Sequence, residues 1–245
     1  MRGTTPAGAR SEQEAARWVR SMFARVAHRY DLANHLLSFN IDRHWRAQTV
    51  RRVRHILRSP TARVLDLCCG TGDLSLALER ARGAPVLGCD FCHPMLLAAR
   101  DKFARRGNRS LLLEADALEL PLADASLDLL TIAFGFRNLA NYVAGLQEIR
   151  RVLRPGGAAA ILEFSQPANP VFAALYDFYS RKILPVIGGA LSGDRGAYAY
   201  LPESVRRFPG AATLADEMRA AGFAEVSYEY MTGGIVALHI GVTGP

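Results

Sequence analysis

The stretch VLDLCCGTGD, residues 64–73, constrains the fold of this 245-residue chain more than any other. An apolar run that contains one acid, Asp66, leads into a short turn with two glycines, and the residues from Asp73 onward are suited to open a helix. A strand that passes through a glycine-bearing turn into a helix is where α/β proteins hold polar groups of a cofactor. The stretch therefore predicts a cofactor site and leaves open which cofactor it holds.

The chain downstream of this stretch alternates between strand-like and helix-like patterns. Apolar runs indicate five strands, at 63–67, 84–90, 110–116, 127–136 and 156–164, and helical periodicity indicates helices at 73–81, 93–106 and 142–153. Two late runs, 225–232 and 234–242, are joined by glycines and predict a terminal hairpin. This order predicts an α/β fold with a doubly wound, mostly parallel sheet.

Residues 1–58 are predicted to form an N-terminal helical lid segment, and residues 59–245 the cofactor-binding domain. Ser11, with Glu14 three residues later, is a capping box that opens one amphipathic helix. A second amphipathic helix is expected over 42–57 with arginines on its outer face. An insertion at 166–212 is rich in aromatic residues and glycine, and we expect a functional loop there.

The positive charge of the chain is concentrated at its N-terminal end. Residues 1–58 contain twelve arginines and four acidic residues, whereas residues 59–245 contain 18 basic and 19 acidic residues. This asymmetry indicates contact with an anionic partner such as a membrane surface, and a solvated helix face is the competing interpretation. No apolar run is long enough to span a bilayer, so the protein is expected in the cytoplasm, peripheral to the inner face of the membrane.

The four cysteines, Cys68, Cys69, Cys89 and Cys92, include a C-x-x-C spacing. In a reducing compartment they are interpreted as small buried side chains rather than as a metal or redox site. The histidines considered, His44, His55, His93 and His239, show no metal-ligand spacing with acids or thiols. We therefore expect no metal.

Polar residues fall where the predicted strands end. Parallel strands place ligands at their carboxyl ends, so Asp66, Gly70, Thr71, Asp90 and Asp116 are expected along one rim. The turn GTGDLS lacks the third glycine of a dinucleotide fingerprint, and an acid at position 73 would repel a pyrophosphate. S-adenosylmethionine instead offers an ammonium that Asp66 attracts and ribose hydroxyls that Asp90 binds.

Several longer segments resemble one family. VLDLCCGTGD, GCDFCHPML, EADALELPLADASLDLL and RRVLRPGG are similar to the motifs of class I S-adenosylmethionine-dependent methyltransferases, although Cys68 stands where the general class has a glycine. HRYDLANHLLSFNIDRHWR, FGFRNLAN and TGGIVALHIG resemble signatures of the UbiE/MenG family. The resemblance covers about residues 20–242 and implies a seven-stranded, Rossmann-like sheet.

The resemblance also implies roles for individual residues. It places cofactor contacts at Thr71, Asp90, Asp116 and Ala117, with the last two beside the adenine. Arg137 and Asn138 follow the fourth predicted strand and are assigned to stabilising a phenolate. Tyr30 is expected to close over the site from the N-terminal segment, and core packing is its competing interpretation.

The implied reaction is C-methylation of a prenylated quinol, with the insertion lining a channel for the tail. The late insertion is closer to menaquinone-type members, so demethylmenaquinol is the expected substrate and menaquinone biosynthesis the expected process. The ubiquinone precursor 2-polyprenyl-6-methoxy-1,4-benzoquinol is the alternative. The oligomeric state stays open, with a homodimer among the options.

Two hypotheses from other classes find less support in the sequence. A NAD-dependent oxidoreductase on a related fold is disfavoured by the missing third glycine and by Asp73. A basic nucleic-acid-binding module is the other hypothesis. The sequence contains no aromatic-rich nucleic-acid-binding motif, so no nucleic-acid partner is expected.

Overall fold

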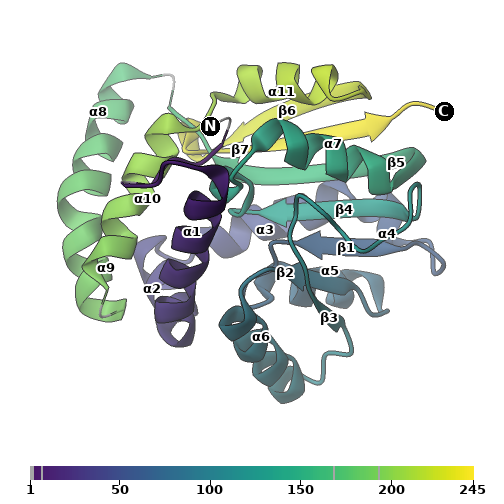
Figure 1. Ribbon diagram of the computed structural model, residues 1–245, viewed down its shortest axis with the longest axis horizontal. Helices are drawn as coiled ribbons and strands as arrows, with labels where there is room; N and C mark the ends of the chain where they lie inside the picture. The colour runs from purple at the N-terminus through teal and green to yellow at the C-terminus, as the bar shows by residue number, and fades with distance from the viewer. Residues whose placement is uncertain (1–2, 7, 168, 193) are drawn as a thin grey trace.

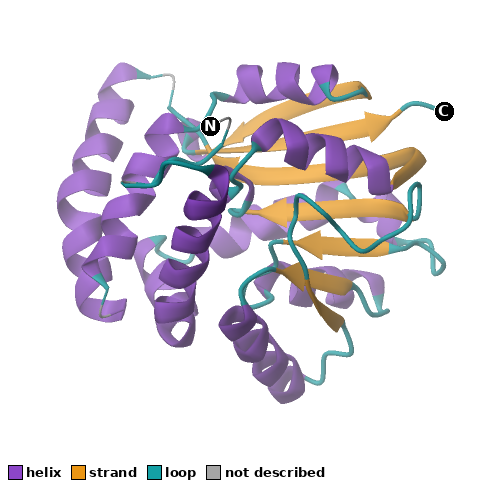
Figure 2. Ribbon diagram, viewed as in Figure 1, coloured by secondary structure: helices purple, strands orange, loops and turns teal. Residues whose placement is uncertain are grey.

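The computed structural model describes residues 3–6, 8–167, 169–192 and 194–245. Within them a seven-stranded sheet runs in the order β3-β2-β1-β4-β5-β7-β6, with helices on both faces (Figures 1 and 2). The strands are β1 (Val64–Leu67), β2 (Leu87–Asp90), β3 (Leu111–Glu114), β4 (Leu127–Ala133), β5 (Leu153–Phe164), β6 (Phe223–Met231) and β7 (Val236–Thr243). The predicted α/β class is confirmed.

Only the last hairpin departs from parallel pairing. The pairs β1–β2, β1–β4, β2–β3 and β4–β5 are parallel, and β7 is antiparallel to both β5 and β6. The strand order reverses between β1 and β4, which creates a crevice at their carboxyl ends. The predicted hairpin over the last two strands is confirmed.

Alternate residues of the strands enter two separate cores. On one face Leu65 and Leu130 pack with α7 (Tyr142–Val152) and α11 (Ala211–Ala220). On the other face Val64 and Leu129 pack with α3 (Ile41–Arg52), α4 (Arg54–Leu57) and α5 (Asp73–Arg82). This period of two is what a sheet buried on both faces requires.

The N-terminal helices do not act as one unit. α1 (Glu12–Val26) begins at Ser11, whose Oγ accepts the Glu14 N–H at 3.2 Å, as the capping box predicted. α1 and α2 (Tyr30–Leu37) pack with α6 (His93–Arg106) in a third core. α3 and α4 instead cover the sheet through Trp45 and Leu57, so residues 41–57 pack with the main layer and not with α1 and α2.

The expected loop at 166–212 is wrong, because the described part of this insertion is mostly helical. α8 (Pro170–Phe178), a π-helical turn (Tyr179–Ile183) and α9 (Leu184–Ser192) follow one another directly, and α10 (Arg195–Arg207) returns beside α9. Figure 1 shows these helices at one end of the molecule, next to α2. Helices allow an aromatic-rich segment to satisfy its backbone hydrogen bonds while it packs.

No helix in the described parts of the chain combines the length and the apolar character that crossing a bilayer requires.

Candidate functional site

A cavity of about 990 Å³, counted with the space open to solvent, lies at the carboxyl ends of β1, β2 and β4. Its lining includes all six residues predicted for the cofactor, Asp66, Gly70, Thr71, Asp90, Asp116 and Ala117, and also Tyr30 and Asn138. Residues far apart in sequence therefore meet at the switch point of the sheet, where ligands bind in folds of this kind. Arg137 does not line this cavity.

The turn after β1 is shaped by left-handed backbone conformations. Cys68, Gly70 and Gly72 have φ values of 54°, 55° and 84°. Glycine adopts this region without strain, whereas a residue with a Cβ does so at a cost of roughly 1–2 kcal/mol. Gly135 leaves the space that the Cys68 side chain fills, because a Cβ added at Gly135 would lie 2.3 Å from the Cys68 Cβ. The predicted space-filling role of Cys68 is consistent with this contact.

Asp66 is buried at the end of β1 and faces the cavity. Its carboxylate accepts hydrogen bonds from Ser75 Oγ at 2.6 Å and from Thr131 Oγ1 at 3.1 Å. Burial raises the pKa of Asp66 to about 7, although both hydroxyls lower it. A buried carboxylate of this kind gains by pairing with a cationic group in the cavity.

Asp90 is the last residue of β2 and binds the backbone of the turn after β1. Its two carboxylate oxygens accept the Gly70 and Cys92 backbone N–H groups, each at 2.9 Å. Burial raises its pKa to about 6, and the backbone hydrogen bonds oppose this rise. A carboxylate has about four acceptor positions, so these backbone hydrogen bonds leave Asp90 able to accept from a ligand in the cavity.

Asp116 and Ala117 follow β3. The Asp116 Oδ1 accepts the Leu118 N–H at 2.9 Å, which fixes the loop, and Ala117 is buried. Cys69 lies in the turn after β1, and Cys89 and Cys92 are buried near the end of β2, all as free thiols. The interpretation of the cysteines as small packing residues is confirmed for the buried pair.

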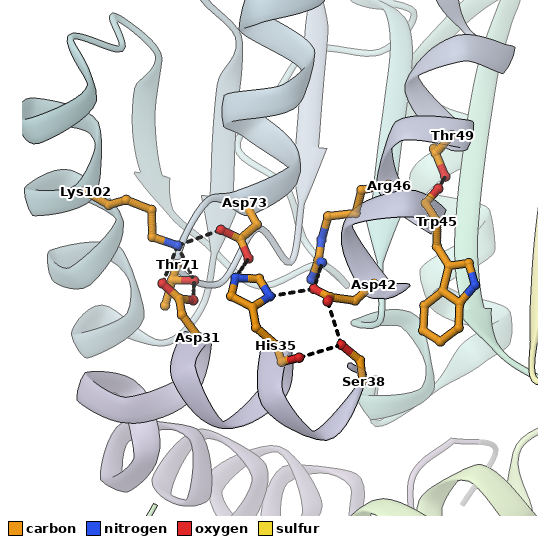
Figure 3. Close-up of polar contacts among 10 residues, drawn as sticks. All are labelled: Asp31, His35, Ser38, Asp42, Trp45, Arg46, Thr49, Thr71, Asp73 and Lys102. Carbon is orange, nitrogen blue, oxygen red and sulfur yellow. Dashed lines mark hydrogen bonds and ion pairs between the residues drawn. The ribbon is translucent and has the colours of Figure 1, made fainter. Parts of the chain in front are cut away.

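Helix α2 is tied to the cofactor turn by a group of ion pairs (Figure 3). Lys102 of α6 lies 2.5 Å from Asp31 Oδ2 and 2.8 Å from Asp73 Oδ1, and it donates to Thr71 Oγ1 at 3.1 Å. The Thr71 hydroxyl in turn donates to Asp31. We name Asp31, Thr71, Asp73 and Lys102 the lid latch, because they join α2 to the turn.

A second group continues from the lid latch into α3. His35 lies between Asp73, at 3.3 Å, and Asp42, at 2.8 Å, and Arg46 pairs with Asp42 (Figure 3). Burial would raise the pKa of Asp42, but its hydrogen bond from Ser38 and the Arg46 charge hold that pKa below its usual range. Ligand atoms of His35, Asp42 and Asp73 lie within 4.8 Å of one another. Because Arg46 and Lys102 already neutralise these carboxylates, the trio is satisfied without a cation.

Arg137 was predicted beside the reacting groups, and it lies in a neighbouring space. It follows β4 in a short 3-10 turn (Phe136–Asn138) and is 5% exposed. Its Nη1 pairs with Glu163 at 2.9 Å and donates to the Phe134 carbonyl at 2.5 Å, and its Nε donates to Ser204 at 3.3 Å. Burial lowers the pKa of Arg137, but Glu163 together with Tyr30 and Tyr200 raises it above its ordinary value, so the guanidinium stays charged.

Tyr30 connects the two spaces. It lines the main cavity and also a second cavity of about 380 Å³, which Arg137, Asn34 and Tyr198 border. Burial raises the pKa of the Tyr30 phenol, and the Arg137 charge lowers it. Tyr30 therefore lies between the predicted cofactor residues and Arg137, and a planar group beside it would face both.

Asn138 sits at the edge of the main cavity and is oriented by Tyr200 of α10. The Tyr200 hydroxyl donates to Asn138 Oδ1 at 3.1 Å and lies 2.6 Å from Thr4 Oγ1. The Asn138 Nδ2 makes a long contact of 3.4 Å with the Phe134 carbonyl. Its amide donor is therefore weakly held and faces a region where an oxygen of a ligand could accept from it.

Several residues of the site were missed from the sequence. Ser75, Lys102, Thr131, Glu163 and Tyr200 each hold a predicted site residue. Glu163 had a signal, because an acid inside an otherwise apolar buried strand requires a partner. The others carry none, since a serine or lysine on a helix acquires its partner only through the tertiary fold.

The sheet order and the cavity at its switch point define a class I methyltransferase fold. The structure of a SAM-dependent methyltransferase from Thermotoga maritima is similar, with a TM-score of 0.64, 20% identity and coverage of 91% of this chain and 99% of that chain. At this identity the likeness shows the fold alone.

The family is shown by sequence. Residues 9–243 match the ubiE/COQ5 methyltransferase family. A demethylmenaquinone methyltransferase from Thermus thermophilus is 51% identical over 90% of this chain and 99% of its own length. A ubiquinone/menaquinone biosynthesis C-methyltransferase UbiE from Syntrophotalea carbinolica is 46% identical over 91% and 92%. The chain belongs to the ubiE/COQ5 methyltransferase family and is an S-adenosylmethionine-dependent enzyme.

Family membership decides between the hypotheses from different classes. The chain is a methyltransferase of quinone biosynthesis, so the oxidoreductase alternative is set aside. The UbiE/MenG resemblance is confirmed.

Proposed function

We propose that this enzyme transfers a methyl group from S-adenosylmethionine to a ring carbon of demethylmenaquinol. One observation supports this most directly: the cavity that contains Asp66, Asp90 and Asp116 adjoins, across Tyr30, a second cavity that contains Arg137. The 51% identity to a demethylmenaquinone methyltransferase supports the choice of substrate.

The residues of the main cavity fit the cofactor. Buried Asp66 is suited to an ammonium, and the remaining acceptor capacity of Asp90 is suited to a ribose hydroxyl. The left-handed conformation at Gly70 brings backbone to the cavity wall with no side chain in between. When bound, the cofactor supplies an electrophilic methyl group on a sulfonium.

Arg137, Asn138 and Tyr30 are proposed to act on the quinol. A quinol carbon becomes a stronger nucleophile when the adjacent hydroxyl loses its proton, so the enzyme must stabilise a phenolate. Arg137 stays protonated and supplies positive charge, and the weakly held amide of Asn138 supplies a donor. Tyr30 bounds the space between them and excludes water from the reacting atoms.

The test of the reaction uses purified enzyme, S-adenosylmethionine and a short-tailed demethylmenaquinol, with mass analysis of the product. We expect one methyl group to be added to the reduced quinol and none to the oxidised quinone, which lacks the nucleophilic ring. The ubiquinone precursor is assayed in parallel, because the Syntrophotalea relative carries both quinone names. Methylation of the ubiquinone precursor alone would overturn the substrate assignment.

The cofactor assignment is tested at Asp90. The Asp90→Asn variant keeps one acceptor for the turn and loses the charge, so we expect S-adenosylmethionine to bind about 10- to 100-fold more weakly, as loss of a charge-assisted hydrogen bond implies. Calorimetry measures the affinity, and thermal unfolding checks that the turn is intact. Unchanged affinity would remove Asp90 from the ribose site.

Membrane contact and self-association are part of the proposal. A prenylated quinol resides in the bilayer, so the enzyme is proposed to work in the cytoplasm against the inner face of the membrane. Arg51, Arg54 and Arg58 of α3 and the segment after it are exposed, while Arg52 pairs with Glu229. A homodimer remains an option that sedimentation would test.

A further inference from the structure

Large apolar side chains are exposed on helices α2, α8 and α9, at one end of the molecule. Phe39 is 74% exposed, Leu175 64% and Val186 63%. The others in this group are Leu32, Leu36, Ile41, Val171, Phe178 and Ile187. Exposed apolar side chains that gather on neighbouring elements mark an interaction surface, whereas single ones do not.

The spacing of these residues gives α2 and α8 one apolar stripe each, and α9 adds Val186 and Ile187. Val171, Leu175 and Phe178 recur at intervals of four and three on α8, and Leu32 and Leu36 are four apart on α2. The stripes are joined where the Phe39 ring lies 6.3 Å from the Tyr179 ring, and where α2 packs on α9 (Figure 1). We name this surface, α2 with its following turn plus α8 and α9, the helical face.

The inner sides of the same helices approach the proposed quinol site. Tyr30 and Asn34 of α2 line the second cavity together with Arg137. Tyr176 of α8 is largely buried, and Arg137 is close enough to lower its pKa against the effect of burial. The helical face is therefore the outer side of the wall that separates the quinol site from solvent.

The charges on and next to the helical face are mainly positive. Lys182, on the π-helical turn between α8 and α9, and Arg43, in the first turn of α3, are exposed, and residues 170–192 contain one acid, Asp177, against two bases. The acids of α2 and α3 are directed inward, because Asp31 pairs with Lys102 and Asp42 with His35 and Arg46. Apolar side chains rimmed by basic groups match the interface of an anionic bilayer.

A second copy of the chain fits this surface less well. A twofold contact places the same patch on both partners, so Arg43 and Lys182 of each copy would face like charges. An anionic lipid surface instead complements those charges and accepts Phe39, Leu175 and Val186 in its acyl boundary.

We propose that the helical face docks the enzyme on an anionic bilayer, so that the quinol head reaches the second cavity while its tail stays in the lipid. This inference rests on the proposed function, because it assumes a prenylated quinol. This docking surface is not the one formed by the N-terminal arginines. Arg51, Arg54 and Arg58 lie at or beyond the C-terminal end of α3, whereas Phe39 lies just before its N-terminal end.

The test compares two double variants in binding to vesicles of phosphatidylglycerol and phosphatidylcholine. Phe39→Asn with Leu175→Gln removes apolar groups from the helical face, and asparagine tolerates the left-handed backbone of residue 39. Leu97→Gln with Leu111→Gln is the matched control, because these leucines are 38% and 68% exposed on α6 and β3. We expect a loss of binding of about tenfold or more for the first variant and little change for the control.

Turnover separates this inference from the proposed function. The Phe39→Asn/Leu175→Gln variant should methylate a long-tailed quinol in vesicles more slowly and a soluble short-tailed quinol at the native rate. If the native enzyme fails on the short-tailed quinol, the proposed function fails, while vesicle binding still reports on docking.

Three outcomes would overturn the docking inference. The first is equal vesicle binding by the two double variants. The second is loss of binding only when Arg51, Arg54 and Arg58 are changed to glutamine. The third is a dimer, seen by sedimentation, that Phe39→Asn/Leu175→Gln dissociates.

Discussion

The two halves of the site are built in different ways. The cofactor half lies at the strand ends and the turn after β1, and its acids are held by groups of that turn, α5 and β4, such as Gly70 for Asp90 and Ser75 for Asp66. The proposed quinol half combines the 3-10 turn after β4 and the end of β5 with α2 and α10, and pairs such as Arg137 with Glu163 and Tyr200 with Asn138 join its parts. The sheet and its first turn position the first half, whereas the second also depends on helices from distant parts of the chain.

This difference implies different responses to substitution. A change in the quinol half breaks a buried contact between distant elements, so stability and activity fall together. A change in the cofactor half leaves the sheet in place and alters affinity. The predictions below test this contrast.

The largest effect is expected at Arg137. Arg137→Leu leaves Glu163 as an unpaired buried charge, which should lower the free energy of unfolding by about 3–5 kcal/mol. We also expect turnover to fall by on the order of 100-fold, because a donor to the phenolate is lost. Denaturant unfolding and steady-state kinetics measure the two effects.

A double variant separates the structural role of Arg137 from its chemical role. Arg137→Met with Glu163→Gln removes both charges and keeps an acceptor for the Phe164 N–H that Glu163 now binds. Stability should largely return while turnover stays low. Recovery of both would show that Arg137 only holds the fold.

A smaller effect, confined to the cofactor half, is expected at Asp66. Its pKa of about 7 should fall when a cationic cofactor binds, so binding near pH 7 should release roughly half a proton from this group. Calorimetry in buffers of different ionisation enthalpy measures the release. Asp66→Asn is the control, because protons released by the cofactor's own groups are the same for both proteins. Equal proton release by the native enzyme and by Asp66→Asn would contradict the prediction.

The pKa of Asp66 has a consequence for the cofactor-free protein. A folded-state pKa of about 7 lies above the ordinary value of 3.8, so protonation favours the folded state. The contribution of Asp66 to stability is therefore full below about pH 4 and is lost as the pH rises through 7. Unfolding of Asp66→Asn should lack this part of the pH dependence.

The smallest effect is expected at the lid latch, where the two halves meet. Lys102→Met removes its ion pairs with Asp31 and Asp73, which are partly exposed and worth about 1 kcal/mol. We expect the cofactor affinity of the variant to be a few-fold lower than that of the native enzyme. Because salt screens ion pairs, added salt should lower the affinity of the native enzyme to near that of the variant. Arg100→Met, on the exposed side of α6, is the control. A larger loss of cofactor affinity in Lys102→Met than in Asp90→Asn would mean that α2, rather than the strand ends, holds the cofactor.

The sheet and the cofactor half could be predicted because their signals are local. The apolar run before Asp66 and the glycines after it define a strand and a turn within ten residues, and parallel strands end on one side. The position of all six cofactor candidates around one cavity follows from that geometry.

The quinol half and the helices over it could not be predicted to the same extent. Residues 170–192 form helices that expose much of their apolar surface, so no buried stripe identified them. The sequence around Arg137 predicted a site residue there, but it did not indicate the contacts of Arg137 with Glu163 and Ser204, which come from distant segments. Such contacts are set by tertiary packing rather than by sequence spacing.

The thiols of the cofactor turn have a chemical consequence. Cys68 and Cys69 line the cavity that we propose for the methyl donor, and a thiolate there would be a competing nucleophile. Burial raises the pKa of both thiols well above the ordinary value, and the nearby carboxylate of Asp90 adds to the effect. Both thiols remain protonated at neutral pH. Bound S-adenosylmethionine therefore faces no thiolate in this cavity that it could methylate.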